Sequence, residues 1–377
     1  MASQHKVLVV GGGISGMTLA HGLARAGMDA RVVESGHRMD QQGTGISLLG
    51  NALRALDQVG LADSCMAAGS GWDTVSIRNH AGEIVNERRP PRTFRPDAPG
   101  AIGIMRPKLA EVLEAAALAS GARIDYRTSV EDFEQDGGGV SYRLSTGETG
   151  RCDLLVAADG TYSKTRLKVY GDEYQPSYAG QGAWRFTVER PAAFDGLVLY
   201  KHQDGRAVGG LPLSDRLCYY FFLENAKVHA HMPQDRLSEM FRARLEGFSA
   251  PDLLAAIGRC DGTRYISYRP FDIVFMAQPW HRGRVVLVGD AAHSVTPQLT
   301  SGGGMAIEDA VVLTEELSQR ANIDDALVAY GQRRRERAKR VFDISLAICQ
   351  AEQDPRADGR RAVELLFEGY GVLAEPF

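Results

Sequence analysis

Short apolar runs and helix-period segments alternate at the start of the chain. Residues 6–10 (KVLVV) form an apolar run that ends at a glycine, which is typical of a strand buried in a parallel sheet. Apolar residues then recur at helical spacing over 14–27, and a second strand pattern covers 29–34. The sequence therefore predicts a βαβ unit with a right-handed crossover.

The pattern changes twice further along the chain. Polar and apolar positions alternate over 72–87, and short strands separated by glycine turns are predicted within 122–157. From about 170 to 269 the chain is rich in aromatic and strand-forming residues, with one helical stretch at 234–246. This block contains no nucleotide-binding turn, which favours an inserted substrate domain. A long helical pattern then begins near residue 324.

Composition excludes several classes of protein. The 377 residues are 44% hydrophobic and 24% charged, as in a soluble globular protein with two domains or one elaborated domain. A net charge of -4 gives no reason to expect nucleic acid or an anionic membrane as a partner. No apolar run approaches the roughly 18 residues needed to span a bilayer. No signal segment precedes the first strand, so a cytoplasmic location is expected.

The cysteines also favour a cytoplasmic location. They are odd in number, widely scattered and without a CxxC pair: Cys65, Cys152, Cys218, Cys260 and Cys349. This pattern argues against a disulfide framework and against a structural zinc site, and it favours a reducing cytosol. No metal site is expected.

The turn after the first strand carries a dinucleotide fingerprint: Gly11-Gly12-Gly13-Ile14-Ser15-Gly16. In this G-x-G-x-x-G pattern Gly11 makes the tight turn, Gly13 lets the backbone approach a pyrophosphate, and Gly16 allows close helix–strand packing. Glu34 ends the second strand about 20 residues later, where an acidic side chain accepts ribose hydroxyls. Strand, helix and carboxylate in register predict dinucleotide binding rather than an ordinary glycine turn.

Two later strands also end in turns that carry a carboxylate. Asp159-Gly160 follows the apolar residues 154–157, and Gly289-Asp290 follows 285–288. Parallel strands bring such residues to the ligand-binding edge of the sheet, where a carboxylate can accept from a ribose or ribityl hydroxyl. Gly302, Gly303 and Gly304 then precede a predicted amphipathic helix over 305–317, and so offer a second helix N-terminus to a neutral or developing anionic group.

In this order and spacing the motifs resemble those of single-component (group A) flavoprotein monooxygenases with the para-hydroxybenzoate hydroxylase fold. The resemblance rests on the turn at 11–16 and on four further elements: Arg106-x-x-Leu109, Asp159-Gly160 with Ser163 and Arg166, Gly289-Asp290-Ala291-Ala292-His293 with Pro297, and Glu308-Asp309-Ala310. It covers nearly the whole chain outside 171–270. It implies an α/β fold in three parts: a discontinuous Rossmann-like FAD-binding domain (1–72, 101–170 and 271–323), an inserted antiparallel β-sheet substrate domain (73–100 and 171–270), and a C-terminal segment with a long helix (324–377).

The resemblance also implies a set of FAD-binding residues: Gly11, Gly13, Ile14, Ser15, Gly16, Glu34, Arg106, Asp159, Asp290, Pro297, Gly302, Gly303 and Gly304. The first glycines and Glu34 would hold the ADP half, Arg106 the phosphate or ribityl region, and Asp290 the ribityl chain. Pro297 and Gly302 would lie along the isoalloxazine, and the Asp159 motif is credited with contacts to both FAD and NAD(P)H. Relatives often have Gly-Gln-Gly and then Asn near the last of these; this chain has Thr300-Ser301-Gly302 and Gly304 instead. The hydrogen bonds to the flavin pyrimidine are therefore not carried over.

The reaction implied is hydroxylation of a small aromatic or heteroaromatic substrate. NADH or NADPH reduces the FAD, O2 adds to give a flavin C4a-hydroperoxide, and an electron-rich ring attacks the distal oxygen. Two alternatives remain open: the same fold catalysing epoxidation or another flavin-dependent oxidation, and a non-redox module that only binds FAD. The choice between the two nicotinamide cofactors, and between a monomer and a homodimer, is also open.

Candidate substrate contacts come from the strand-rich block. Arg185, between two aromatic residues, could pair with a substrate carboxylate or be an ordinary strand arginine. Tyr219 and its neighbour Tyr220 point to opposite faces, so only one of them can line the pocket. His202 could act as a base, or it could be a solvated hairpin residue. His293 is expected to be structural, and the basic run over 333–340 is expected to be the solvated face of the last helix.

Overall fold

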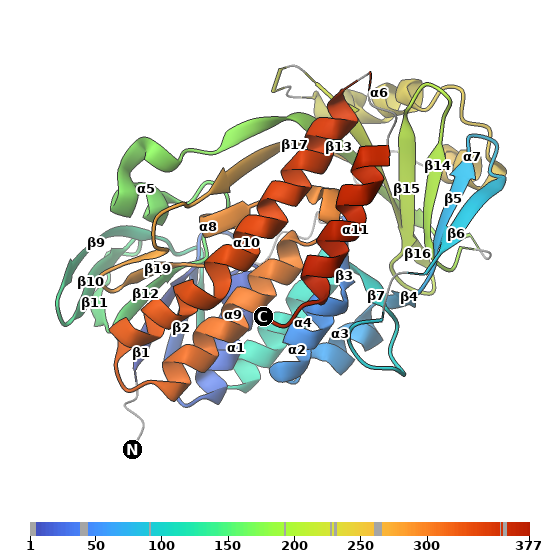
Figure 1. Ribbon diagram of the computed structural model, residues 1–377. Coiled ribbons are helices and arrows are strands. Elements are labelled where there is room, and N and C mark those ends of the chain that lie inside the picture. The colour runs from blue at the N-terminus through green and yellow to red at the C-terminus, as the bar shows by residue number, and fades with distance from the viewer. Residues whose placement is uncertain are drawn as a thin grey trace.

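A computed structural model shows how these segments assemble (Figure 1). It describes residues 5–37, 44–89, 92–191, 194–226, 228–229, 232–259, 266–354, 356 and 360–377. Two large sheets, each with helices packed on it, are joined by a small sheet and by a long helix that extends over both (Figure 1). The predicted class, a Rossmann-like α/β fold with a second β-sheet and a long C-terminal helix, is confirmed.

The first large sheet has six strands, in the order β18 (His281–Arg282), β19 (Val285–Leu287), β12 (Leu154–Ala157), β1 (Lys6–Val10), β2 (Asp29–Glu34) and β8 (Arg123–Tyr126). All neighbouring strands are parallel except β18 and β19. In β1, Val7 and Val9 enter the main core on one face, whereas Leu8 and Val10 enter a second core on the other. Burial on both faces explains why this strand is an apolar run rather than an alternating one.

Helices cover one face of this sheet and a small β-sheet covers the other. The helices are α1 (Ile14–Arg25), α4 (Arg106–Ala119), α9 (Gly302–Gln319) and α10 (Ile323–Gln353). The covering sheet consists of β9 (Val130–Asp136), β10 (Gly139–Leu144) and β11 (Thr149–Cys152). The sheet edge between these two layers is left to the loops that follow β1, β2, β12 and β19.

The second large sheet has seven strands, in the order β17 (Ile266–Phe275), β13 (Ser177–Glu189), β16 (Leu217–Asn225), β15 (Ala207–Pro212), β14 (Leu197–Lys201), β5 (Val75–Asn79) and β6 (Ile84–Arg88). Its strands are antiparallel except at the β14–β5 pair, where the early 73–100 segment joins the 171–270 block in parallel. The helices α6 (Leu237–Arg244) and α7 (Pro251–Gly258) and the turn η2 (Gln234–Arg236) follow β16, and α6 and α7 pack on one face. The division into domains stays a prediction.

Smaller elements join the two sheets. They are the strands β3 (Gly45–Leu49), β7 (Ala101–Met105) and β4 (Ser70–Trp72), the helices α2 (Gly50–Gln58), α3 (Ala62–Ala68), α5 (Lys164–Tyr170), α8 (Asp290–His293) and α11 (Arg360–Ala374), and the short helices η1 (Gly171–Tyr174) and η4 (Pro297–Leu299). The α10 helix extends from the parallel sheet toward β13, and α11 packs back on α10 (Figure 1).

Three further properties concern the described residues only. None of their helices is long and apolar enough to cross a membrane. The described cysteines, Cys65, Cys152, Cys218 and Cys349, are buried and free, and Cys260 lies outside the described residues. Within the same part of the chain no group of three or more His, Cys, Asp or Glu side chains could hold a metal ion.

Candidate flavin site

Four of the predicted residues lie at one edge of the parallel sheet. Gly11 follows β1, Glu34 ends β2, Asp159 follows β12, and Asp290 follows β19. These strands are mutual neighbours and run in the same direction. Their carboxyl ends therefore meet, as the sequence predicts for a ligand-binding edge.

The glycines of the first turn have two different roles. Gly11 has φ +107°, and a Cβ there would lie 2.3 Å from the carbonyl oxygen of Ala158. A Cβ at Gly16 would lie 2.0 Å from the carbonyl oxygen of Gly11. Gly13 is different, because a Cβ built there meets no atom within 4 Å. The outer glycines let the chain pack, whereas Gly13 leaves the backbone open toward the sheet edge.

Glu34 lies directly beside this turn. Its carboxylate accepts hydrogen bonds from the backbone N–H of Gly12 at 2.7 Å and of Gly36 at 2.6 Å. Both contacts hold the carboxylate at the end of β2, next to the start of α1. That is the position from which an acidic side chain reaches the ribose of a dinucleotide whose phosphates lie at the helix N-terminus.

Asp290 and Arg106 lie close enough at this edge for the charge of each to act on the pKa of the other. Both side chains are exposed, yet protein surrounds them closely enough that desolvation shifts both pKa values. Burial raises the pKa of the Asp290 carboxyl, and the positive charges of His293 and Arg106 partly oppose the rise. Burial, together with the charge of Arg185, lowers the pKa of Arg106, which Tyr219 and Asp290 oppose. Both side chains therefore reach solvent while neighbouring protein atoms still shift their pKa values.

The last glycine segment reaches the same edge. A Cβ at Gly303 would lie 2.9 Å from Ile46 Cδ1 and 3.6 Å from Ile14 Cδ1, and one at Gly289 would lie 3.0 Å from Ser15 Oγ. The three glycine segments, far apart in sequence, therefore meet around the start of α1. The predicted start of the amphipathic helix over 305–317 is wrong, because α9 begins at Gly302 and the glycines form its first turn. Their N–H groups are consequently the unpaired donors of that helix end.

Thr300, in the segment where the resemblance implies a different sequence, has an unusual backbone. The residue directly follows η4 (Pro297–Leu299), and it has φ +53° in the left-handed region. A β-branched side chain is poorly tolerated there, because the Cβ crowds the carbonyl oxygen that follows. Glycine would adopt the same backbone without strain.

We expect Thr300→Gly to stabilise the protein by about 0.5–1 kcal/mol. Removal of left-handed strain of about 1–2 kcal/mol is partly offset by the greater chain entropy of glycine when unfolded. Ser301, with φ -107°, is the matched control, and Ser301→Gly should destabilise. Thermal unfolding of the FAD-loaded protein measures both. A transition temperature for Thr300→Gly at or below that of the parent would contradict the assignment of strain.

The carboxylate of Asp159 accepts hydrogen bonds from residues of its own turn. One oxygen accepts from Ser163 Oγ at 2.5 Å, and the other accepts from the N–H and Oγ1 of Thr165 at 3.1 and 2.9 Å. The buried Arg166 then donates to the carbonyl oxygens of Ala291 and Thr161 at 2.9 and 2.7 Å. In this structure the Asp159-Gly160 motif therefore fixes the turn after β12 and ties it to the turn after β19.

A buried charge network behind the edge was missed from the sequence. Asp309 accepts from the N–H of Gly289 at 2.8 Å and from Arg334 Nε at 2.8 Å, and its Oδ2 lies 2.6 Å from His293 Nε2. Glu308 accepts from Arg334 Nη1 at 2.6 Å and from Arg337 Nε at 2.8 Å. Burial alone would raise the pKa of Asp309, but His293 and Arg334 lower it to about 2. The network fixes the Gly289 turn, and His293 is part of it.

The prediction that residues 333–340 form a solvated face is therefore wrong in part. Arg334 is 0% exposed and Arg337 is 6% exposed, because they lie three residues apart on the inner side of α10. Lys339 and Arg340 are exposed, as predicted. The sequence contained a signal for this pairing: the adjacent acids Glu308 and Asp309 lie in a segment otherwise rich in buried apolar residues.

Arg185 and Tyr219 come together on the open face of the seven-stranded sheet. The neighbours of Arg185, Trp184 and Phe186, are fully buried under α6 and α7, so Arg185 points the other way. Its Nε donates to the hydroxyl of Tyr219 at 3.1 Å. Within the described part of the chain no carboxylate lies at ion-pair distance from Arg185, which is half-buried and lies close enough to Arg106 to affect its pKa. An unpaired cation at this position fits an anionic ligand.

His202 lies elsewhere. It follows β14 at a hairpin, and its ring packs on His80 and Phe248 at centroid distances of 5.4 and 5.3 Å. Its Nδ1 is 2.9 Å from the carboxylate of Asp204. Phe248 belongs to the core under the covered face of the sheet, so this histidine is not brought to the flavin edge.

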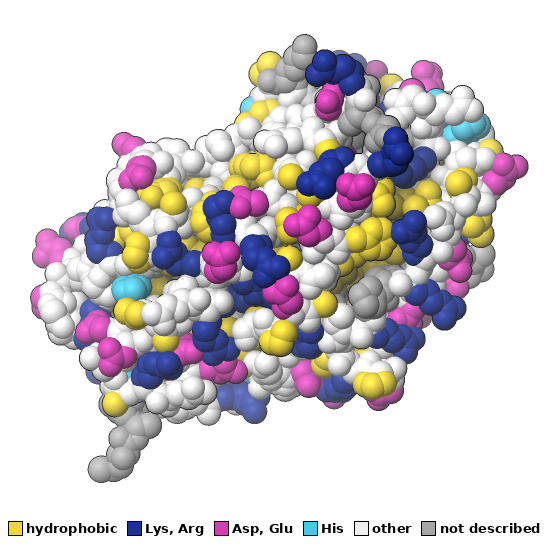
Figure 2. All heavy atoms as spheres, in the orientation of Figure 1, with side chains coloured by type: hydrophobic (Ala, Val, Ile, Leu, Met, Phe, Trp, Pro, Cys, Tyr) yellow, Lys and Arg dark blue, Asp and Glu magenta, His cyan; other side chains and the backbone are white. Residues whose placement is uncertain are grey.

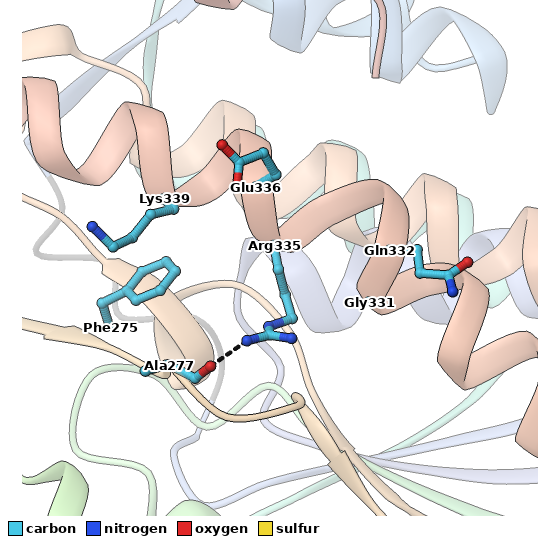
Figure 3. A pocket seen from close by; sticks show the side chains of 7 residues that line it. All are labelled: Phe275, Ala277, Gly331, Gln332, Arg335, Glu336 and Lys339. Atoms are coloured by element: carbon cyan, nitrogen blue, oxygen red, sulfur yellow. Dashed lines mark hydrogen bonds between the residues drawn. The ribbon is translucent and has the colours of Figure 1, made fainter.

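A surface hollow between β17 and α10 contains none of the predicted site residues (Figure 3). Arg335 crosses it and donates to the carbonyl oxygen of Ala277, while Lys339 lies beside Phe275 (Figure 3). The hollow is lined by Phe275, Ala277, Gly331, Gln332, Arg335, Glu336 and Lys339. The chemistry-bearing residues lie instead at the sheet edge described above.

The edge fits FAD. The open Gly13 backbone and the start of α1 suit a pyrophosphate, Glu34 a ribose, and the exposed Asp290 a ribityl hydroxyl. Arg106 brings a positive charge to the same edge, and the first turn of α9 points free N–H groups toward a flavin pyrimidine.

Comparisons with known proteins agree with this geometry. A family described as "FAD binding domain" matches residues 4–345. The Bacillus subtilis (strain 168) protein YetM is 31% identical over 376 residues, spanning 98% of this chain and 99% of that protein. Aurachin C monooxygenase/isomerase of Stigmatella aurantiaca is 31% identical over 348 residues, 92% of this chain and 89% of that protein. A crystal structure of Klebsiella pneumoniae HpxO with FAD and uric acid has a TM-score of 0.84 at 26% identity and covers 100% of this chain and 94% of that one.

Proposed function

The chain belongs to the FAD binding domain family and is a flavoprotein monooxygenase, and from this premise we propose that it hydroxylates a small aromatic or heteroaromatic compound. The reductant is NADH or NADPH, and the oxidant is O2. One oxygen atom enters the ring and the other leaves as water, while NAD(P)H and a proton supply the electron pair and the hydrogen. The alternatives of another flavin-dependent oxidation and of a non-redox module become outcomes of the test.

One observation carries the proposal: the residues suited to FAD and the unpaired Arg185 converge on a single edge. Arg185 lies close enough to Arg106 for its charge to lower the pKa of Arg106, although Arg185 comes from strand β13 and Arg106 from the start of helix α4. Two like charges at a desolvated site favour an anion between or beside them. Phosphate or flavin oxygens can meet Arg106, which leaves Arg185 for the substrate.

Each group at the edge has a distinct task. The turn at Gly11–Gly16, Glu34 and Asp290 would hold FAD, whose bound flavin supplies electron transfer and the activation of O2. Arg185, oriented by the hydroxyl of Tyr219, would hold an anionic oxygen of the substrate and fix the ring in one orientation. Arg106 and Asp290 place opposite charges close together at this edge, where Arg106 would meet phosphate or flavin oxygens and Asp290 a ribityl hydroxyl.

Similar proteins support the substrate class. HpxO has been crystallised with FAD and uric acid, a heteroaromatic compound, and its structure covers the full length of this chain. The Stigmatella aurantiaca relative is named as a monooxygenase and isomerase of aurachin C. Both support a ring-containing substrate here, and neither identifies it.

The test is a substrate screen with the FAD-reconstituted protein. Consumption of NADH and of NADPH is followed over phenols, hydroxybenzoates, hydroxypyridines, purines and quinolones, together with product mass. We expect at least one compound to accelerate consumption and to gain one oxygen atom. A protein that stays colourless after reconstitution overturns the assignment, and FAD-loaded protein without compound-dependent NAD(P)H oxidation favours the non-redox module.

We expect Arg185→Met to raise the KM for an anionic substrate by roughly 10–100-fold, with a smaller change in kcat. A hydrogen bond to a charged group is worth about 1.5–3 kcal/mol, and each 1.4 kcal/mol is a factor of ten. Arg185→Lys, which keeps the charge but loses the planar fork, should fall between parent and Arg185→Met.

The control for this change is Arg216→Met, an exposed arginine in the turn between β15 and β16. It should leave both parameters unchanged, and the flavin spectrum should be unchanged in all three variants. Equal KM values for Arg185→Met and the parent would remove Arg185 from the substrate site.

A further inference from the structure

The strand register aligns one row of side chains across the open face of the seven-stranded sheet. Arg185 on β13 pairs with Phe221 on β16, and Phe221 pairs with Gly209 on β15. Gly209 pairs with Leu199 on β14, and Leu199 pairs with Ile77 on β5. Directly paired residues share a face of the sheet. With neighbouring strands about 4.8 Å apart, the row extends roughly 19 Å from Arg185 to Ile77.

The row is polar at one end and apolar along the rest. Phe221 is half-buried beside the small core of Leu211, Leu213 and Tyr219. Leu199 and Ile77 are also half-buried, but among the described residues they belong to none of the apolar clusters. These two side chains, on neighbouring strands, are therefore apolar surface that the fold covers only in part.

Gly209 makes the middle of the row flat. A Cβ built at Gly209 would lie 2.0 Å from Phe221 Cζ and 2.5 Å from each of its Cε atoms, so the phenyl ring lies over the glycine. In the row, Gly209 therefore lies between the Phe221 ring, which lies along the sheet, and the aliphatic side chain of Leu199. Such a floor suits an extended apolar chain, which gains from continuous contact and needs no polar partner.

The α11 helix lies beside this sheet, and Arg88 of β6 contacts it. Figure 2 shows hydrophobic side chains gathered in a furrow between α11 and the strands of this sheet. Phe367 and Val363 on α11 are 45% and 38% exposed. The guanidinium of Arg88, at the end of β6, lies 4.9 Å from the centre of the Phe367 ring and links α11 to the sheet.

We propose that the substrate is amphipathic: a planar ring whose anionic or enolisable oxygen meets Arg185, carrying an apolar chain that lies along Phe221, Gly209, Leu199 and Ile77. This inference rests on the proposed function and adds the substrate class. The apolar chain is assigned to the substrate because the apolar row starts at Arg185, beside the flavin edge, and is continuous from there to Ile77. An apolar chain on the ring would cover the part of Leu199 and Ile77 that the fold leaves open.

The experiment is a chain-length series measured by binding. The FAD-loaded protein is titrated with 2-alkyl-4-quinolones and with alkyl hydroxybenzoates from methyl to nonyl, and Kd is read from the change in flavin absorbance. We expect Kd to fall about fourfold for each added methylene, the factor that corresponds to burial of one CH2 group, in at least one series. A Kd that does not depend on chain length in either series overturns the proposal.

Variants locate the chain. Leu199→Gln should weaken binding progressively, with little loss for short chains and the largest loss for chains that reach β14. Val328→Gln is the matched control, since Val328 is 47% exposed on α10 and lies outside the row. A loss from Leu199→Gln that is equal for every chain length would be a structural effect and overturns the assignment. If that variant does not fold, Ile77→Gln provides the same comparison at the end of the row.

Two other outcomes are distinguishable. Sedimentation of the parent and of Leu199→Gln shows whether a second copy of the chain covers the face; a dimer that the substitution dissociates, with no chain-length dependence, overturns the proposal.

The binding series does not require turnover. A dependence of Kd on chain length without NAD(P)H oxidation would contradict the proposed function alone, and oxygenation of short-chain rings without such a dependence would contradict this inference alone.

Discussion

Gly13→Val is expected to abolish FAD binding while leaving the apoprotein folded. The backbone of Gly13 has φ -75° and ψ -170°, which any residue adopts, and a Cβ there meets no protein atom within 4 Å. A valine side chain would instead occupy the space through which a pyrophosphate approaches the start of α1. Loss of two charge-assisted hydrogen bonds, each worth about 1.5–3 kcal/mol, weakens FAD binding by about 100-fold or more.

Gly16→Val is the matched comparison within the same turn. A Cβ at Gly16 would lie 2.0 Å from the carbonyl oxygen of Gly11, so this substitution should disrupt the packing of α1 on β1 and unfold the domain. The measurements are the FAD-to-protein absorbance ratio, Kd by flavin fluorescence, and the thermal transition of each apoprotein by circular dichroism. A Gly13→Val protein that purifies yellow with full FAD content would place the pyrophosphate elsewhere.

Arg334→Leu is expected to destabilise the protein by about 3 kcal/mol or more. Arg334 is 0% exposed and donates to both Glu308 and Asp309, which are themselves fully buried. Removal of one partner from a buried ion pair leaves an uncompensated charge, for which the penalty is about 3–5 kcal/mol. Arg337 still pairs with Glu308, so the lower end of that range is expected. Urea unfolding of the FAD-loaded protein measures the change.

Arg340→Ala on the same helix is the control. Arg340 pairs with Glu375 at 2.7 Å, but both side chains are more than two-fifths exposed (43% and 48%). An exposed pair of this kind contributes about 0–1 kcal/mol. Because Asp309 also holds the Gly289 turn, Arg334→Leu should weaken FAD binding as well, whereas Arg340→Ala should not. Equal urea midpoints for the two variants would contradict a structural role of the buried network.

Local sequence rules were most successful where one strand and one turn contained the whole signal. The apolar run at β1, the glycine turn after it and Glu34 at the end of β2 are separated by few residues, and their geometry follows from backbone sterics. The carboxylates after β12 and β19 could be placed at the same edge because parallel strands align their carboxyl ends. No contact between distant segments had to be known for these predictions.

The same rules failed where the partner of a residue is distant in sequence. Arg334 and Arg337 belong to a basic run that looks like a solvated face, and only the packing of α10 on α9 shows that Glu308 and Asp309 lie opposite them. His202 looked like a candidate base, but its hairpin lies against the covered side of the sheet. The start of α9 was misplaced because glycine disfavours helices in isolation, whereas here the three glycines form the first turn.

The sequence by itself determined the cofactor edge of this protein, because spacing within a βαβ unit and the direction of parallel strands fix where glycines and carboxylates lie. The tertiary structure alone decided the substrate side. Alternation shows that Arg185 and Trp184 point to opposite faces, but which face is open depends on where α6 and α7 pack. The row from Arg185 to Ile77 is a property of register across strands up to 108 positions apart in sequence, as counted from residue 77 to residue 185. Such pairings are set by the burial of whole faces, which no local pattern contains.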